Sequence, residues 1–382
     1  MNLCFICGEY PPWPHGGIGT VTQMIGKELV RRGHRVRVIG IRERGDASPE
    51  EEVDAGVEIL RLPQPRVRHL GWLRSRYLLY QQVATWARRG EIDLLEAPDY
   101  EGWTAAWPRL PIPVVVRLHG SVSYFSCETG RRISRVIFEV ERMALRKAAF
   151  HCSTSRYTAE RTRQLFRLQR FEPRILYNPV ELPEKDNSSK PPGCRVVFTG
   201  SLAIKKGVIP LVRAWGEVIR VLPNAQLHLY GRDGKSPAGG SMREYLLSQL
   251  PDSVLASIVF HGHVTSEVLL EALRSAAVGV FPSFSEAFGL APMECMAQGR
   301  PTIYSLRAGP GPELITDGEN GLLIDPAKEA EIARAIIQVV SDGDLATRLG
   351  AAGRRRIQES FSIEAIVRQN LAFYHDCVNH YS

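Results

Sequence analysis

The chain has no run of about 18 uncharged apolar residues, which is the length that a membrane-spanning helix requires. Its seven cysteines are an odd number scattered through apolar segments, and they do not suggest a disulfide framework. Cys4 and Cys7 form a C-x-x-C pair, but no second pair exists to complete a zinc site. No basic leader or cleavage signature precedes the first apolar segment. We therefore expect a cytoplasmic protein that needs no metal.

Acidic residues are missing from positions 61–90, a stretch that contains seven arginines, and the net charge of the chain is +7. A second cluster of arginines lies in 156–174. These basic stretches carry no nucleic-acid-binding motif, which argues against nucleic acid as a partner. Three alternatives remain: a solvated basic face, a site for an anionic acceptor, or peripheral association with the anionic inner face of a membrane. In the last case each Lys or Arg near the lipid contributes about 1 kcal/mol.

The length of 382 residues and the 44% hydrophobic content favour two domains, each with its own core. Short apolar runs alternate with amphipathic stretches, which is typical of βα units on a parallel sheet. A proline- and serine-rich segment at 179–194 interrupts this pattern and is predicted to be a linker. We therefore predict an N-terminal domain over 1–178, a C-terminal domain over 195–360, and a terminal helix within 361–382 that packs back on the first domain.

The predicted fold is two Rossmann-like, doubly wound parallel sheets that face a central cleft, because such sheets bind ligands at the carboxyl ends of their strands. The expected strands are Asn2–Glu9, Arg35–Ile41, Val57–Leu62, Asp93–Ala97, Val114–His119, Phe150–Thr154, Arg174–Tyr177, Arg195–Thr199, Gln226–Tyr230, Ile258–His261, Val278–Phe281, Thr302–Ser305 and Leu322–Ile324. The expected helices are Gly19–Arg32, Leu73–Arg89, Ser134–Ala148, Val208–Val221, Glu267–Ser275, Pro292–Ala297, Ala327–Val340 and Ile363–Val378.

Two carboxylates, Glu286 and Glu294, bracket a glycine-containing turn that follows the apolar run Val278–Pro282. Pro292 suits the start of a helix, so Glu286 is predicted in the strand-to-helix loop and Glu294 in the first helical turn. The free N–H groups of that helix start favour an anion. Carboxylates beside a phosphate would repel it, so we expect them to bind hydroxyl groups of the same ligand, as in a nucleotide-sugar. The alternative is two solvated acids favoured by the helix dipole.

Glycine turns follow the first predicted strand of each domain. In the first domain the turn contains Gly16 and Gly17, without the last glycine of the dinucleotide fingerprint, which argues against an NAD-dependent oxidoreductase. In the second domain the turn runs from Gly200 to Gly207 and contains Lys206. A lysine there is able to neutralise a diphosphate, although an ordinary surface lysine is the alternative.

Three further polar positions have both a functional and a structural interpretation. His119 ends an apolar strand, where it is either a cleft residue or a structural histidine. Asn178 lies where the domains meet and suits a turn equally well. The triplet Asp342-Gly343-Asp344 is similar to the D-x-D metal motif of other sugar transferases, but its polar surroundings favour a turn.

The order and spacing of these motifs resemble one family, the retaining glycosyltransferases of the GT-B fold, and within it the GT4-like group (glycosyl transferases group 1). The matching segments are Pro11–Thr20, Arg32–Val36, Gly200–Gly207, Phe260–Val264, Pro282–Glu294, Pro312–Ile315 and Gly318–Leu323. The resemblance spans nearly the whole chain and is strongest over Gly200–Pro326.

The resemblance implies a role for each matching position. Glu294 would bind the ribose diol of the nucleotide and Glu286 the donor sugar, while Lys206 would bind the diphosphate and His119 would lie beside the reacting carbon. The remaining donor-binding residues implied are Gly16, Gly17, Gly200, Ser201, Gly262, His263, Val264, Ala287, Phe288, Gly289 and Leu290. The implied reaction is metal-independent transfer of a hexose-type sugar, with retention, from a UDP- or GDP-linked donor to an acceptor hydroxyl. Polysaccharide, glycolipid or glycoconjugate biosynthesis is the implied setting, and the acceptor is unknown.

One position departs from the family, because Ser201 stands where many members have an arginine. One diphosphate cation is therefore missing, and Arg117, Lys205 or a main-chain contact is expected to compensate. The alternatives to a transferase are a sugar phosphorylase or nucleotide-sugar epimerase of the same fold, and a non-catalytic sugar-binding protein.

Overall fold

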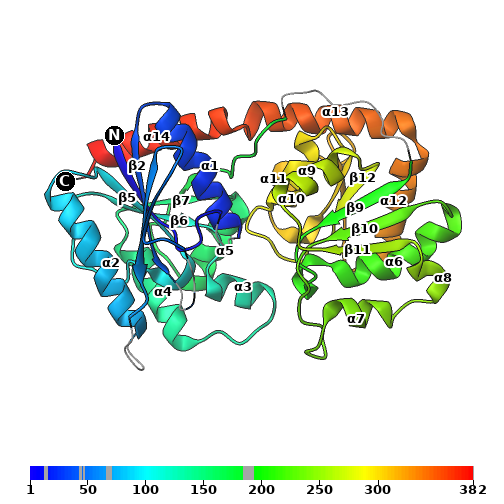
Figure 1. The fold of residues 1–382 in the computed structure, drawn as a ribbon, viewed down its shortest axis with the longest axis horizontal. Coiled ribbons are helices and arrows are strands. Elements are labelled where there is room, and N and C mark those ends of the chain that lie inside the picture. Colours follow the sequence, from blue (N-terminus) through cyan, green and yellow to red (C-terminus); the bar gives the residue numbers. More distant parts are fainter. Residues whose placement is uncertain (13–15, 43–44, 46–47, 66–70, 184–192, 382) are drawn as a thin grey trace. The chain divides into compact units, whose positions relative to one another are not determined.

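A computed structural model describes residues 1–12, 16–42, 45, 48–65, 71–183 and 193–381. The chain forms two compact units, drawn in Figure 1. Unit 1 holds Met1–Pro179 together with Ile363–Ser382, and unit 2 holds Val180–Ser362. Of the predicted linker, residues 184–192 lie outside the described part of the chain.

Unit 1 is built on an eight-stranded sheet with the order β3-β4-β2-β1-β5-β6-β7-β8. All neighbouring strands are parallel except β3, which pairs antiparallel with β4 at one edge. The strands are β1 (Asn2–Ile6), β2 (Arg35–Arg42), β3 (Glu51–Asp54), β4 (Val57–Pro63), β5 (Leu94–Pro98), β6 (Val114–Leu118), β7 (Phe150–Ser153) and β8 (Arg174–Ile175). The central strands are mostly apolar, as expected where helices cover both faces of a parallel sheet, with Glu96 in β5 and Arg117 in β6 as exceptions.

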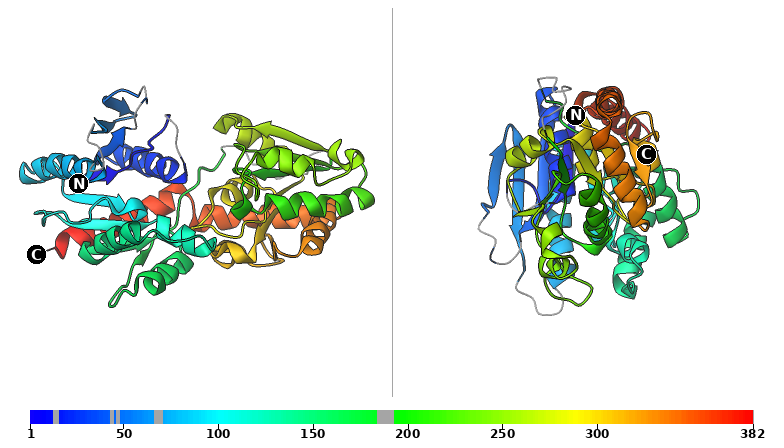
Figure 2. Two further views of the ribbon diagram at one scale, coloured as in Figure 1. Left: turned by 90° about the horizontal axis from the view of Figure 1, so that it is seen from below. Right: turned by 90° about the vertical axis from the view of Figure 1, so that its right-hand side faces the viewer.

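The helices of unit 1 lie on both faces of this sheet (Figure 2). They are α1 (Gly17–Arg31), α2 (Gly71–Arg88), the 3-10 turn η1 (Tyr100–Gly102), α3 (Val122–Glu128), α4 (Arg135–Lys147), α5 (Arg156–Phe166) and α14 (Ile363–Asn379). The last helix, α14, packs beside α1, so the end of the chain completes the unit that its beginning starts.

Unit 2 is built on a six-stranded, wholly parallel sheet with the order β11-β10-β9-β12-β13-β14. Its strands are β9 (Arg195–Thr199), β10 (Gln226–Tyr230), β11 (Ile258–Gly262), β12 (Val278–Phe281), β13 (Thr302–Ser305) and β14 (Leu322–Ile324). Its helices are η2 (Ile204–Lys206), α6 (Val208–Val221), α7 (Met242–Leu247), α8 (Asp252–Leu255), α9 (Ser266–Arg274), α10 (Leu290–Ala297), η3 (Leu306–Ala308), α11 (Gly311–Leu314), α12 (Glu329–Ser341) and α13 (Gly343–Ser360). Trp215 of α6 is fully buried in the core between this sheet and the helices α6 and α12.

The sequence pattern did not predict β3, α3, α5, α7, α8, α11 and α13, and the reason is clearest for α13. Its glycines interrupt the apolar period, yet Gly350 is needed because a Cβ there would lie 2.2 Å from the carbonyl oxygen of Gly299. Asp342, at the predicted turn, caps α13 by accepting from the N–H groups of Asp344 and Leu345. Among the described helices, none is long and apolar enough to cross a membrane.

Candidate active site

The two loops that follow β9 and β12 in unit 2 place a lysine and a glutamate in contact. Lys206 Nζ donates to Glu286 Oε1 at 2.5 Å, and the hydroxyl of Ser283 donates to the same oxygen at 2.9 Å. The side chains of Lys206 and Glu286 keep 24% and 12% of their exposure, whereas Ser283 is buried. The buried hydroxyl of Ser283 therefore positions Glu286, and the ion pair stays partly exposed, where a ligand can reach it.

The backbones of these two loops approach each other as closely as their residues allow. Gly207 has a φ of +69°, and a Cβ at this position would lie 1.8 Å from the carbonyl oxygen of Pro282. The N–H of Phe284 also donates to the carbonyl oxygen of Lys205 at 2.7 Å. Glycine is therefore required at position 207, since any side chain there would push the two loops apart and separate Lys206 from Glu286.

Helix α10 begins at Leu290, two residues before the predicted start, with Gly289 as its N-cap residue. Gly289 has a φ of +90°, and a Cβ here would lie 2.7 Å from the hydroxyl of Tyr304. That hydroxyl donates to the carbonyl oxygen of Phe288 at 3.0 Å and holds the turn. No side chain from the described residues caps this helix, so Ala287–Leu290 leads into an uncapped N-terminus of the kind that favours anions.

Because α10 starts early, the prediction that Glu294 lies in its first turn is wrong. Glu294 lies in the second turn, half-buried, and the described residues give its carboxylate no hydrogen-bond partner. Burial raises the pKa of Glu294 from 4.5 to about 7. A carboxylate that is desolvated and unpaired is suited to accept hydrogen bonds from a ligand.

The other predicted donor residues of unit 2 lie along the carboxyl ends of β9, β10 and β11. The N–H of Gly200 donates to the carbonyl oxygen of Tyr230, and the N–H of Gly231 donates to that of Gly262. A Cβ on Gly200 would lie 3.8 Å from Cδ of Lys206, so the lysine stem passes over this glycine. Ser201, Gly262 and His263 are exposed, and Val264 is half-buried. The predicted donor residues of unit 2 therefore lie together at the carboxyl ends of its strands.

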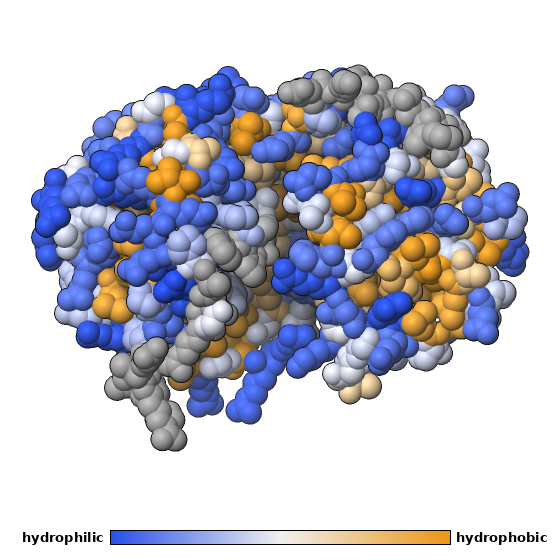
Figure 3. Space-filling model, viewed as in Figure 1, coloured by the Kyte–Doolittle hydropathy of each residue, from blue (hydrophilic) through white to orange (hydrophobic). Residues whose placement is uncertain are grey.

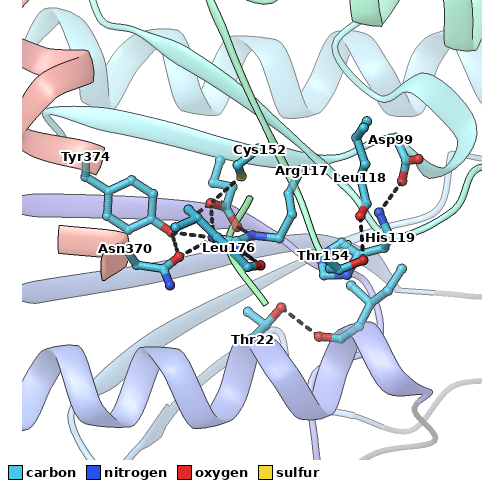
Figure 4. A network of polar contacts seen from close by, with 12 residues as sticks. Thr22, Asp99, Arg117, Leu118, His119, Cys152, Thr154, Leu176, Asn370 and Tyr374 are labelled. Atoms are coloured by element: carbon cyan, nitrogen blue, oxygen red, sulfur yellow. Dashed lines mark hydrogen bonds and ion pairs between the residues drawn. The ribbon is translucent and has the colours of Figure 1, made fainter. Parts of the chain in front are cut away.

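In unit 1, His119 follows β6 and is half-buried (Figure 4). Burial, together with the charge of Arg117, lowers the pKa of His119 to about 3, so its imidazole is neutral at pH 7. Its backbone N–H donates to Oδ1 of Asp99 at 2.9 Å, while Oδ2 of this buried carboxyl has no partner among the described residues. Burial raises the pKa of Asp99 to about 8. Asp99 is a residue that sequence reasoning missed.

The glycine turn of unit 1, whose Gly16 and Gly17 are predicted to bind the donor, already contains a carboxylate. Gly16 is the N-cap residue of α1 and Gly17 is its first residue, and both are exposed. Glu9, from the turn after β1, accepts a hydrogen bond from the N–H of Gly19 at 3.1 Å. An incoming phosphate would meet the negative charge of Glu9 at this helix start. Residues 13–15 of this loop lie outside the described part of the chain.

Arg117 does not replace the missing arginine at position 201, and this expectation is wrong. Its guanidinium is buried and makes two hydrogen bonds, at 2.7 and 2.9 Å, to the carboxylate of Glu96. It also donates to Asn370 and Tyr374 of α14 (Figure 4). Sequence reasoning placed Arg117 correctly on a strand but had no means of finding its partners.

Two sequence models of related glycosyltransferase families match most of the chain. One, described as Glycosyl transferases group 1, matches residues 193–342, and the other, Glycosyltransferase Family 4, matches residues 15–184. An uncharacterized glycosyltransferase of Methanocaldococcus jannaschii is 25% identical over 98% of both chains.

Solved structures show that the fold is GT-B, as predicted. Sucrose-phosphate synthase from Thermosynechococcus elongatus superposes with a TM-score of 0.81 over 100% of both chains, at 22% identity. HepE of Anabaena, solved in complex with UDP and glucose, superposes with a TM-score of 0.75 at 18% identity, over 98% of this chain and 100% of its own.

Proposed function

This chain belongs to the group 1 and family 4 glycosyltransferases, and we propose that it transfers a hexose-type sugar from a nucleoside diphosphate donor to an acceptor hydroxyl. The proposed donor is UDP- or GDP-linked, and the proposed transfer retains the anomeric configuration and uses no metal. The observation that carries the proposal is the contact between Lys206 and Glu286, held by Ser283 beside the uncapped start of α10.

The proposed chemistry separates the two members of this ion pair when the donor binds. Lys206 turns to the diphosphate, and Glu286 accepts hydrogen bonds from hydroxyl groups of the donor sugar. The bond between the anomeric carbon and the diphosphate oxygen breaks, and the acceptor oxygen bonds to the same face of that carbon. The acceptor proton moves to the leaving diphosphate. Lys206 and the helix start near Gly289 stabilise the negative charge that develops there.

The other proposed donor contacts lie at the carboxyl ends of the strands of unit 2. Glu294 accepts from the ribose diol, and Gly262, His263 and Val264 lie along the base. The binding of UDP and glucose by HepE supports a nucleotide-sugar as the donor, since the two folds agree over 98% of this chain. In unit 1 the neutral imidazole of His119 is suited to exchange a hydrogen bond with the sugar without adding charge beside the reacting carbon.

The setting is a further part of the proposal. We place the enzyme in the cytoplasm, at the anionic inner face of a membrane, where a glycolipid or lipid-linked acceptor would be available. The basic surface of unit 1 supports this location, because arginine-rich faces bind anionic lipid.

The test is the release of nucleoside diphosphate from a panel of UDP- and GDP-sugars with candidate acceptors. Glu286→Ala should reduce turnover by orders of magnitude, whereas Glu217→Ala, on the exposed side of α6, should behave like the wild type. Product formation that requires inorganic phosphate would indicate a phosphorylase, and interconversion of donors without acceptor would indicate an epimerase. Near-normal transfer by Glu286→Ala would contradict the site.

A further inference from the structure

The proposed diphosphate site of unit 2 has too little positive charge for its ligand. A nucleoside diphosphate brings more than one negative charge, and the carboxylates of Glu286 and Glu294 add to it. Lys206 is the lysine assigned to the diphosphate, and in the structure it is paired with Glu286. The start of α10 contributes only a partial positive charge. A further cation is therefore needed at the carboxyl ends of these strands.

Arg232, in the loop that follows β10, is a basic residue of this edge with no acidic partner among the described residues. It is exposed, and its guanidinium donates a long hydrogen bond of 3.4 Å to Nε2 of His263. Arg307 and Lys328, in neighbouring loops, instead form ion pairs at 2.7 and 2.8 Å. On the side of unit 2 drawn in Figure 3, hydrophobic and hydrophilic residues are interspersed, so hydropathy does not mark a ligand site there.

The backbone of Arg232 is held against the glycine loop that follows β9. Its carbonyl oxygen accepts from the N–H of Leu202 at 2.9 Å. A Cβ on Gly231 would lie 1.9 Å from the carbonyl oxygen of Gly200, so the two loops are in direct contact. Arg232 is therefore fixed beside the loop that carries the lysine of the proposed diphosphate site.

The strand register identifies the neighbour of Arg232. Leu202 pairs with Asp233 in the same register that joins β9 to β10, so the uncharged Ser201 lies opposite Arg232. Both residues are exposed. Asp233 also accepts from the hydroxyl of Ser241, the N-cap residue of α7, at 2.7 Å. The position of Arg232 is thus determined on both sides, while its side chain faces solvent.

The strand order places Arg232 between two parts of the proposed donor site. Strand β10 lies between β11 and β9. The segment 262–264, proposed to lie along the base, is at the end of β11, and the loop with Lys206 follows β9. A ligand that contacts both loops passes the residue that follows β10.

We propose that Arg232 is a second cation of the donor site and binds the diphosphate beside Lys206. A guanidinium is always charged, and its fork of N–H groups matches two oxygens of a phosphate. Leaving His263 costs little, because that hydrogen bond is long and exposed. The inference rests on the proposed function, since it takes a nucleoside diphosphate as the ligand.

The test is isothermal titration calorimetry of the full chain with UDP and with GDP. Arg232→Gln should weaken the affinity for the diphosphate that the wild type binds by about 10- to 100-fold, as expected for a lost hydrogen bond to a charged group. The matched control is Arg243→Gln, whose guanidinium lies 5.5 Å from the ring centroid of Phe260, and it should bind like the wild type. Uridine and guanosine, which have no phosphate, should bind the wild type and Arg232→Gln equally. An equal loss for nucleoside and diphosphate would place Arg232 on the base and contradict the proposal.

Moving the charge makes the test stricter. Ser201→Arg supplies a guanidinium from the neighbouring position, and in the Arg232→Gln background it should restore most of the lost affinity. Circular dichroism checks that all variants fold. No restoration in a folded double variant, or a loss in Lys205→Gln without one in Arg232→Gln, overturns the inference. Unchanged affinity in Arg232→Gln overturns it as well and leaves the proposed function intact, whereas a wild type that binds neither UDP nor GDP overturns both.

Discussion

Two ion pairs in this molecule, one in each unit, have similar chemistry and opposite surroundings. In unit 1, Arg117 and Glu96 keep only 1% and 7% of their side-chain exposure. In unit 2, Lys206 and Glu286 keep 24% and 12%. Asn370 and Tyr374 of α14 contact the first pair, whereas Ser283 from the same loop contacts the second. The comparison indicates that burial, more than charge, separates a pair that holds the fold from one that a ligand is able to open.

Breaking the buried pair, Arg117 and Glu96, should have the largest effect on stability. Glu96→Gln leaves the buried guanidinium of Arg117 with an uncompensated charge, and we expect a loss of about 3–5 kcal/mol in the free energy of unfolding. Urea denaturation measures this loss. Lys206→Met, which breaks the open pair, should cost less than about 1 kcal/mol of stability. Similar losses in both variants would contradict the distinction between the pairs.

Breaking the partly exposed pair, Lys206 and Glu286, should reduce the reaction rate rather than the stability. Lys206→Met removes the cation proposed to stabilise the leaving diphosphate, and we expect kcat to fall by about 10²–10³-fold, as when other oriented donors are removed. Initial rates of diphosphate release measure the effect. Arg220→Met, at an exposed position in the last turn of α6, is the control and should keep most of the activity.

Removing the buried serine tests how firmly the open pair is positioned. Ser283→Ala deletes a hydrogen bond to a charged group, worth about 1.5–3 kcal/mol, and we expect kcat/KM to fall by about 10- to 100-fold. Ser285→Ala is a matched control, because its hydroxyl is equally buried but has no hydrogen-bond partner among the described residues. A positioning role also predicts that Glu286→Gln and Ser283→Ala are not additive. Full additivity would place Ser283 outside this role.

The smallest expected effect is the pH dependence of donor binding. The pKa of Glu294 is raised to about 7, so its carboxyl is increasingly neutral below this pH and loses acceptor capacity. If the carboxylate binds the ribose diol, KM for the donor should rise about tenfold from pH 8 to pH 6, as the ionised fraction falls. Glu294→Gln should abolish this dependence. A wild-type KM that is constant over this range would remove Glu294 from the donor site.

The sequence predicted the strands of unit 2 more accurately than those of unit 1, for physical reasons that particular residues show. Strands such as Val278–Phe281 and Thr302–Ser305 are short apolar runs between turns, and their predicted bounds agree with the structure. Helix α13 was missed because Gly350 interrupts its apolar period. Glycine is needed there for close contact with the backbone of Gly299, and the pattern of apolar residues does not reveal such a contact. The edge strand β3 has no apolar period, since its exposed residues contribute little to the core.

The candidate site was predictable where a residue's role depends on its neighbours in the chain. Lys206 and Glu286 were assigned from their glycine turns, and the structure brings them into contact. Asp99 was missed because its partner, the N–H of His119, follows a different strand. Ser283 and Glu9 have partners close in sequence, but a hydroxyl or carboxylate in a loop does not show which of its neighbours it will contact. Gly289 explains the error at Glu294, since its positive φ starts α10 before the proline that marked the predicted start.

The return of the chain to unit 1 through α14 has a consequence for synthesis on the ribosome. Arg117 and Glu96 emerge early, but Asn370 and Tyr374, which complete their surroundings, follow only after the whole of Val180–Ser362. At about 5–20 residues per second this interval lasts roughly 10–40 s. During that time the Arg117–Glu96 pair of the nascent first unit lacks its contacts with α14. Unit 2 has all of its strands before α14 leaves the exit tunnel, so the unit that is translated first is the last to be completed.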